Sequence, residues 1–116
     1  MSLQQTIAKK VTYSGIGLHS GQPVRLSFVP APADSGIRFR RTDISESDTV
    51  AARIRYVTNT MRATTLENGA VMVTTVEHVL SAIRALEIDN IIVELDSVEP
   101  PVGDGSAAVF VGLLAL

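Results

Sequence analysis

The stretch TTVEHVLSAIRALEIDNIIVEL, residues 74–95, predicts a helix followed by a strand and thereby indicates the fold class. Thr74-Thr-Val-Glu77 has the spacing of a capping box, in which a Ser or Thr and a Glu three residues later close the start of a helix. Residues 89–95 then alternate, which is typical of a half-buried strand with Ile91, Val93 and Leu95 on one face. In the predicted helix, apolar residues recur on one stripe, at Val76, Val79, Leu80, Ile83 and Leu86.

Strand signals occupy most of the chain before residue 74. Val24, Leu26 and Phe28 alternate with polar residues as far as Pro30, and we expect residues 6–13 to pair with them through the glycine-rich connection 14–21. Asn68-Gly69 lies between two apolar runs and predicts a hairpin that joins residues 64–67 to 70–74. Two further strands are predicted around the alternating pairs Ile37 with Phe39 and Ile54 with Tyr56. The pattern as a whole predicts mostly strands, with two helices.

The second predicted helix, residues 107–116, has no polar face. Ser106 is its expected N-cap, and its end lacks the Gly, Asn or basic residues that close helices. A helix that is apolar all round requires burial on all sides, and this chain has little left to cover it. We therefore interpret the chain as a piece of a longer protein. We expect the piece to be marginally stable or to associate with itself, because three of its side chains would be partly uncovered, namely Phe110, Leu113 and Leu114.

The composition excludes several classes of protein. A length of 116 residues suits one domain, and 46% hydrophobic with 19% charged residues excludes disordered, collagen-like and coiled-coil chains. A net charge of −2 leaves no electrostatic footprint for nucleic acid or an anionic membrane surface. Because Cys is absent, disulfides, thiol nucleophiles and cysteine-ligated zinc are excluded. With no signal peptide and no apolar run long enough for a membrane span, we expect a cytoplasmic protein.

The candidates for chemistry are the two histidines, His19 and His78, and the carboxylate next to the second one. Glu77 and His78 both lie off the apolar stripe, so one interpretation is two exposed side chains in a first helical turn. The other is a zinc hydrolase, in which a carboxylate accepts a proton from water and a His holds the metal. The His-Glu-x-x-His motif is absent, and spacing does not select His19 or Asp104 as a further ligand. The pattern leaves both interpretations open.

Several short motifs occur in an order that is more specific than any one of them. They are Gly15-Ile-Gly-Leu-His-Ser-Gly21, Arg40-Arg-Thr-Asp43, Asn59-Thr-Met61, Thr75-Val-Glu-His78, Asp89-Asn-Ile-Ile-Val-Glu94 and Asp104-Gly-Ser-Ala107. In this order they closely resemble the N-terminal half of the bacterial UDP-3-O-acyl-N-acetylglucosamine deacetylases, the zinc amidases of lipid A biosynthesis. The resemblance covers the chain from about residue 4 to its end.

The resemblance implies a fold and a domain organisation. Residues 1–116 would form a single domain, the first of the two domains of the deacetylase, and the second domain would be absent. The implied fold class is α+β, a two-layer sandwich in which a mainly antiparallel sheet of about five strands packs against two helices. The active site of the family lies between the two domains.

The resemblance also implies roles for individual residues. By it, Glu77 is the general base and His78 one zinc ligand. The remaining zinc ligands come from a His-Lys-x-x-Asp helix in the family's second domain, so we expect the chain to be inactive alone. The intact enzyme would hydrolyse the N-acetyl group of UDP-3-O-acyl-N-acetylglucosamine in the cytoplasm, on the pathway to a membrane lipid. The residues expected to bind this substrate are His19, Thr60, Met61 and Ala63.

The alternative is a stand-alone module without catalytic activity. It would keep the same domain fold and use its exposed face for partner binding or dimerisation. The apolar second helix and the missing zinc ligands favour this alternative, whereas the adjacent Glu77 and His78 favour the enzyme. A nucleic-acid-binding domain is disfavoured by the net charge and by the scarcity of aromatic residues.

Overall fold

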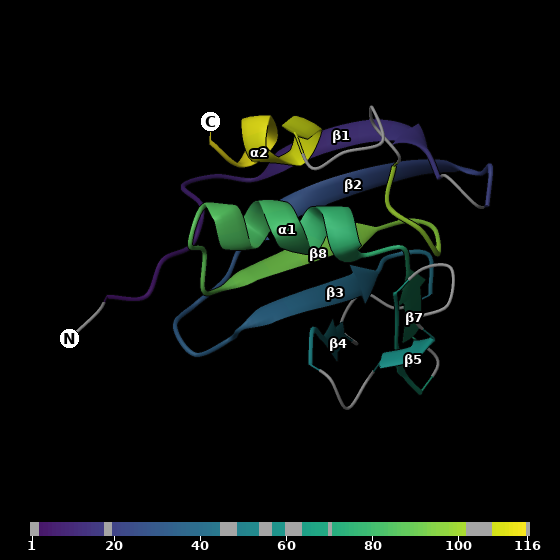
Figure 1. The fold of residues 1–116 in the computed structure, drawn as a ribbon, viewed down its shortest axis with the longest axis horizontal. Coiled ribbons are helices and arrows are strands. Elements are labelled where there is room, and N and C mark those ends of the chain that lie inside the picture. The colour runs from purple at the N-terminus through teal and green to yellow at the C-terminus, as the bar shows by residue number, and fades with distance from the viewer. Residues whose placement is uncertain are drawn as a thin grey trace.

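A five-stranded sheet forms one layer of the fold in the computed structural model, which describes residues 3–17, 20–44, 49–53, 57–59, 64–69, 71–101 and 108–115. In order across the sheet, its strands are β1 (Val11–Ile16), β2 (Pro23–Pro30), β8 (Ile91–Leu95), β3 (Ile37–Arg41) and β4 (Thr49–Ala51) (Figure 1). The central strand β8 pairs antiparallel with β2 and parallel with β3. The pairs at the two edges of the sheet are antiparallel.

Alternating side chains along the central strands build the core. In β2, Leu26 and Phe28 are completely buried, whereas Arg25 is exposed. In β8, all three residues of the predicted apolar face are buried, namely Ile91, Val93 and Leu95. Because successive side chains of a strand point to opposite faces, one face of the sheet is apolar and the other is polar. The strands predicted around these residues and around Phe39 are confirmed.

The first strand was predicted at residues 6–13 but begins later in the structure, at Val11. The amides of Asp89 and Asn90 both donate to the Gln5 carbonyl oxygen, at 2.9 and 3.0 Å, and hold that segment against the turn before β8. The Ala31 amide donates to the Thr6 hydroxyl at 3.1 Å. These contacts engage the segment before β1 elsewhere, so pairing with β2 begins at Val11 and continues to Ile16.

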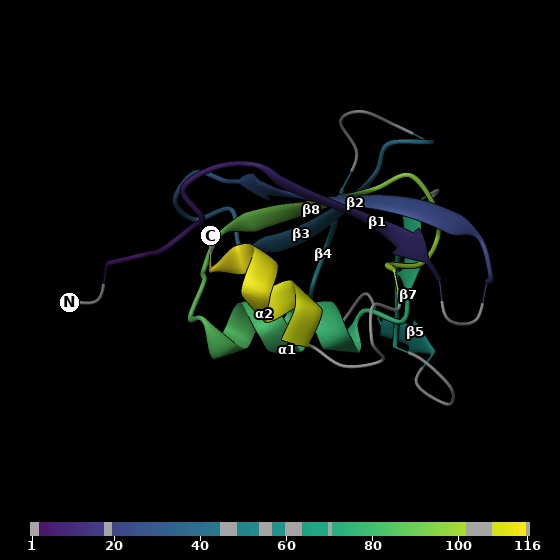
Figure 2. The same ribbon diagram turned by 90° about the horizontal axis from the view of Figure 1, so that it is seen from above.

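Both helices of the described residues, α1 (Glu77–Ala85) and α2 (Ala108–Leu114), lie on one face of the sheet (Figure 2). The ring of Phe110 in α2 meets that of Phe28 in β2 edge to face, with centroids 6.2 Å apart. The residues that α1 buries are Val79, Ala82 and Ile83. Within the part of the chain that the structure describes, no helix is long and apolar enough to cross a membrane. The predicted α+β sandwich, with two helices against a mainly antiparallel five-stranded sheet, is confirmed.

The exposure predicted for the second helix is wrong at two positions. Phe110 and Leu114 are only 1% and 7% exposed, and Leu113 is half-buried. The helix lies beside α1 and turns its smallest residues outward, which are Ala108, Gly112 and Ala115. Burial of the two large side chains removes the observation from which self-association was predicted. The predicted N-cap Ser106 and the predicted end residues Ala107 and Leu116 lie outside the described residues.

A second, three-stranded sheet flanks the main one in the order β5 (Val57–Asn59), β6 (Thr65–Asn68) and β7 (Val71–Thr74). β6 and β7 form the predicted hairpin, in which Asn68 pairs with Val71. Gly69 begins the turn at φ +62°, a conformation that glycine adopts without steric cost. The short strands β4 and β5 were not predicted, and the strand expected around Ile54 and Tyr56 lies outside the described residues.

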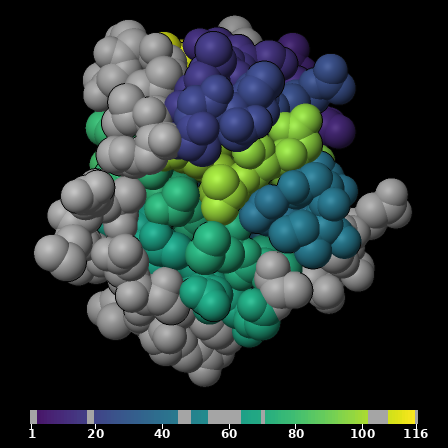
Figure 3. Space-filling view, turned by 90° about the vertical axis from the view of Figure 1, so that its right-hand side faces the viewer, coloured from purple at the N-terminus to yellow at the C-terminus, as the bar shows by residue number. Residues whose placement is uncertain are grey.

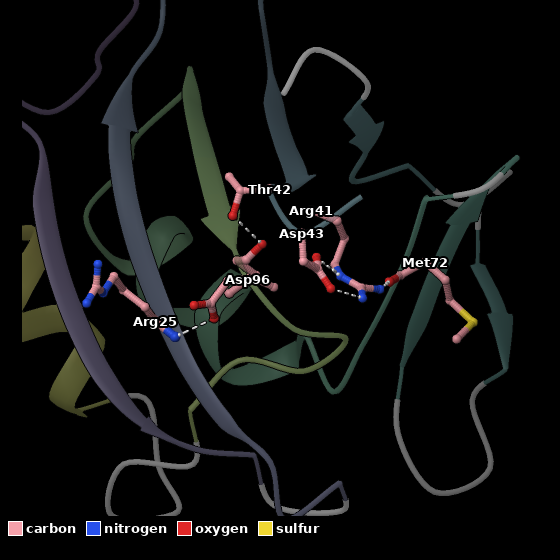
Figure 4. A network of polar contacts seen from close by, with 7 residues as sticks. Arg25, Arg41, Thr42, Asp43, Met72 and Asp96 are labelled. Atoms are coloured by element: carbon pink, nitrogen blue, oxygen red, sulfur yellow. Dashed lines mark hydrogen bonds and ion pairs between the residues drawn. The ribbon is translucent and has the colours of Figure 1, made fainter. Parts of the chain in front are cut away.

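Arg41, at the end of β3, connects the two sheets (Figure 4). Its Nε and Nη2 donate to the two carboxylate oxygens of Asp43 at 2.8 and 2.6 Å, and its Nη1 donates to the Met72 carbonyl oxygen in β7 at 2.9 Å. These hydrogen bonds from Arg41 hold the pKa of Asp43 below its ordinary value of 3.8. Next to Arg41, the Thr42 amide donates to the Leu95 carbonyl oxygen at 2.8 Å. The end of β3 is thus bonded to both β8 and the smaller sheet.

Candidate active site

Helix α1 follows β7 after a two-residue link and carries Glu77 and His78 in its first turn. Val76 occupies the N-cap position and is completely buried among the core residues. An apolar anchor at this position fixes the end of the helix against the sheet. The two candidate residues lie half-buried at the rim of the core, so they are less exposed than their position off the apolar stripe suggested.

The predicted capping box is wrong, because no side chain caps α1. The hydroxyl of Thr74, the predicted capping residue, instead shares a hydrogen bond with the Thr65 hydroxyl of β6 at 2.8 Å. The Glu77 carboxylate accepts a hydrogen bond from the Thr64 amide. Both ends of the predicted capping box are thus bonded to the segment around β6 rather than to the start of α1.

One oxygen of the Glu77 carboxylate is anchored and the other is not. Oε2 accepts from the Thr64 amide at 3.1 Å, and the Val76 amide donates to the Thr64 carbonyl oxygen at 3.4 Å, so residue 64 is bonded twice to the start of α1. Oε1 is buried and has no hydrogen-bond partner among the described residues. The other such atom in the described residues, Arg40 Nε, belongs to a guanidinium that already pairs with Glu94 at 2.8 Å.

An unpartnered buried carboxylate oxygen has a physical meaning. Leaving such a group without a hydrogen bond costs about 1–3 kcal/mol, more for a charged group, and native proteins rarely do so without a reason. The Glu77 carboxylate is acceptor-only when ionised, so Oε1 is oriented to receive a proton or a hydrogen bond. The anchored Oε2 keeps it in that orientation.

A hollow of about 290 Å³ opens beside Glu77. It lies between α1 and the segments around β4 and β6, and its residues are Ala52, Arg53, Thr64, Leu66, Glu77, Leu80, Ser81 and Arg84. Ligand pockets in proteins commonly measure about 300–1,000 Å³, so the hollow is near the small end of that range. Glu77 is thus one of the residues that border a space large enough for small polar groups such as water.

His78 supplies an imidazole next to this carboxylate. Adjacent residues of an α-helix point about 100° apart, and His78 is not among the residues that line the hollow. A catalytic zinc takes three protein ligands. Within the described ranges, no three His, Asp or Glu side chains gather closely enough to hold a metal ion. The donor set of this chain therefore fits one part of a zinc site, with one imidazole and one carboxylate that could act on a bound water.

The residues expected to bind substrate cannot be placed against the site. His19, Thr60, Met61 and Ala63 all lie outside the described residues, as does Asp104. Their chain neighbours are described. Ser20 follows His19 and donates its amide to the buried Glu99, and Thr64 follows Ala63 and donates its amide to Glu77.

Two residues that the sequence did not reveal support the site. Thr64 acts through its backbone amide, which leaves no signal in the residue type. Glu99 is completely buried and binds Ser20 and Thr75. In the sequence, Glu99 is a single carboxylate between Val98 and two prolines, a segment that is typical of a loop, and nothing there indicates burial.

Comparison with known proteins decides the family. A family model described as UDP-3-O-acyl N-acetylglycosamine deacetylase matches residues 4–116, which is nearly the whole chain. The chain belongs to this family. The predicted resemblance is thereby confirmed.

Individual deacetylases agree with the family model. Proteins named UDP-3-O-acyl-N-acetylglucosamine deacetylase are 50% identical to this chain over 114 residues in Bdellovibrio bacteriovorus and 51% identical over 111 residues in Anaeromyxobacter sp.. The alignments cover 98% and 96% of this chain but 38% and 36% of those deacetylases. A third, from Psychrobacter cryohalolentis, is 49% identical over 96% of this chain and 35% of its own length. The chain thus spans little more than a third of these relatives.

Proposed function

We propose that the full-length protein containing this chain is a zinc-dependent deacetylase that hydrolyses the N-acetyl group of UDP-3-O-acyl-N-acetylglucosamine, releasing acetate and the free amino sugar. Membership of the family and the names of its relatives support the reaction and its substrate. The single observation in the structure that carries the proposal is the Glu77 carboxylate, with one oxygen anchored and the other buried without a partner. The lipid A pathway follows from the substrate, and a cytoplasmic location stays a prediction.

In this proposal, Glu77 is the general base. The Thr64 amide holds Oε2, so Oε1 accepts the proton of a water that enters the adjacent hollow. Transfer of this proton to Oε1 converts the water into a hydroxide that attacks the amide carbonyl carbon. The C–N bond then breaks, and a proton donor from the second domain, outside this chain, would protonate the leaving amine.

His78 is the proposed zinc ligand of this chain. When bound, zinc would lower the pKa of a water to about 7 and polarise the amide carbonyl. His78 would bind through its neutral imidazole, and the other ligands would come from a second domain outside this chain. That requirement agrees with the described residues, in which no cluster of three ligands occurs, and it makes the isolated chain inactive.

The proposed substrate contacts are His19, Thr60, Met61 and Ala63. Support comes from their chain neighbours, because the Ser20 and Thr64 amides are both held by carboxylates next to α1. This anchoring holds Ser20 and Thr64, the neighbours of His19 and Ala63 in the sequence, near the start of the helix.

Two substitutions in the full-length protein test the proposal. We expect Glu77→Gln to lower kcat by about 100- to 10,000-fold while zinc stays bound, because only the proton acceptor is lost. Glu67→Gln, at an exposed position of β6, is the matched control and should leave kcat unchanged. We expect His78→Ala to lose zinc, measured by metal analysis of the purified protein. Near-normal turnover in Glu77→Gln, or unchanged zinc content in His78→Ala, would reject the respective role.

A further inference from the structure

The residue before the N-cap of α1 has an unusual backbone. Thr75 has φ +58°, in the left-handed region that β-branched residues rarely enter. Such a conformation persists only when the surrounding structure holds it, and it recurs at functional sites. Two residues later in the chain stands Glu77. The strained residue therefore lies at the point where the chain turns from β7 into the candidate catalytic helix.

The contacts of Glu99 show what holds Thr75. Glu99 is 0% exposed, its Oε2 accepts from the Thr75 hydroxyl at 2.5 Å and its Oε1 accepts from the Ser20 amide at 2.9 Å. The neighbouring backbone adds a further bond, since the Thr74 amide donates to the Val98 carbonyl oxygen at 2.9 Å. Hydrogen bonds to an ionised acceptor are stronger and shorter than neutral ones. One buried carboxylate thus links two segments that are far apart in the sequence.

The segment that carries Glu99 lies between these two parts of the molecule. In Figure 3 the yellow-green residues that follow β8 separate the purple and blue N-terminal strands from the green residues that lead into α1. Gly17 pairs with Pro101, and an added Cβ at Gly17 would overlap Glu99 Oε1. The carboxylate is therefore enclosed by the backbone on one side and by the Thr75 turn on the other.

We propose that Glu99 and Thr75 are positioning residues of the active site: the buried carboxylate holds Thr75 in its left-handed conformation and so fixes where α1 begins and where Glu77 points. The same carboxylate anchors the Ser20 amide, which ties the segment after His19 to the start of the helix. This inference rests on the proposed function, because it concerns the position of the general base. Neither residue touches the reacting atoms.

The test compares substitutions of Thr75 in the full-length protein. Thr75→Val keeps the side-chain shape and removes the hydroxyl, whereas Thr75→Ser keeps the hydroxyl. We expect Thr75→Val to lower kcat by about ten- to hundredfold, the effect of a small misplacement of a catalytic group, with KM within about threefold of wild type. Thr75→Ser should restore kcat to within about threefold. Val93→Ala, a cavity in the central strand, is the control for lost stability and should leave kcat unchanged well below its melting temperature.

A second variant and a second measurement keep the proposal testable if Thr75→Val does not fold. Thr75→Gly adopts a positive φ without strain but offers Glu99 no hydroxyl, so it should fold and still lose kcat. Amide hydrogen exchange over residues 76–80 should be faster in Thr75→Val and Thr75→Gly than in Thr75→Ser and Val93→Ala, and this readout does not depend on the reaction.

The outcomes separate the two proposals. An inactive wild-type protein would refute the proposed function, and exchange rates would then decide whether Glu99 holds the start of α1. An active wild type with unchanged kcat in Thr75→Val or Thr75→Gly would overturn the positioning role and leave the proposed function standing. Equal loss of kcat in Thr75→Ser would also overturn it, because the hydroxyl would then not be the group that acts.

Discussion

Replacing Gly17 by Ala tests whether the buried Glu99 carboxylate can move. An added Cβ at Gly17 would overlap Glu99 Oε1 and Ser20 Oγ. The Ser20 hydroxyl can rotate to another rotamer. Glu99 is completely buried, and both of its oxygens accept hydrogen bonds, so its carboxylate has no free space to enter. We therefore expect Gly17→Ala to displace the carboxylate and weaken its bonds to the Ser20 amide and the Thr75 hydroxyl.

The size of the effect follows from these contacts. Overpacking a closed site costs about 1–3 kcal/mol, and a lost hydrogen bond to a charged group costs about 1.5–3 kcal/mol. These two costs do not add fully, because a carboxylate that moves away relieves part of the overlap as it loses its hydrogen bonds. We therefore expect a total cost of about 2–3 kcal/mol. Gly21→Ala is the matched control. Gly21 has φ +65° and open space around its Cβ position, so an alanine there meets no neighbour. The left-handed conformation costs this alanine about 1–2 kcal/mol. The lower conformational entropy of the unfolded variant offsets part of that cost.

Urea unfolding of the full-length variants, followed by a probe in this domain such as amide hydrogen exchange of residues 97–99, measures the difference. Gly17→Ala should be less stable than Gly21→Ala by about 1 kcal/mol or more, and its exchange at residues 97–99 should be faster. Equal stability of the two variants would show that overlap with Glu99 costs no more than the left-handed conformation in Gly21→Ala does, and the reasoning about a fixed Glu99 would then be wrong.

Two further predictions concern stability. Phe110→Ala removes the ring that packs edge to face on Phe28, and should cost about 3–5 kcal/mol and speed hydrogen exchange throughout α2; a loss below about 1 kcal/mol would show that α2 is not held by this contact. Arg41 holds the pKa of Asp43 below 3.8 in the folded protein, so the pair adds stability at neutral pH that is lost as the pH falls below about 4. Because the Asp43 side chain is 35% exposed, we expect the gap in melting temperature between wild type and Asp43→Asn to correspond to about 0.2–1 kcal/mol at pH 7 and to shrink as the pH falls below about 4. A gap that stays constant over this range would contradict the assignment.

Side-chain periodicity made the centre of the fold predictable. Leu26 and Phe28 in β2 alternate with polar residues because one face of the sheet meets the helices, and this constraint is visible in a single strand. The stripe on α1 and the turn at Asn68-Gly69 are equally local. The late start of β1 was not predictable, because it depends on Gln5 bonding to Asp89, a contact between residues far apart in the chain.

The same distinction applies to the candidate site. Glu77 and His78 were found because they interrupt an apolar pattern and match a family motif. The capping box was predicted wrongly because the motif describes only bonds within the first helical turn, whereas the Thr74 hydroxyl and the Glu77 carboxylate bond to Thr65 and Thr64. The burial of Phe110 was missed for a similar reason, since a pattern of residues does not specify which side of a short helix meets the sheet.

The position of β8 also determines the order of events during synthesis of the chain. β8 joins β1–β2 to β3–β4, and these two halves share no other hydrogen-bonded strand pair in the main sheet. Until residues 91–95 leave the ribosome, each half is a two-stranded unit, and such units have marginal stability in water. Closing the sheet then requires contacts between residues far apart in the sequence, which slows folding and leaves apolar surface uncovered in the meantime. Translation pauses that hold residues 91–95 inside the ribosome should therefore leave the nascent chain dependent on chaperones, whereas pauses after these residues have emerged should not.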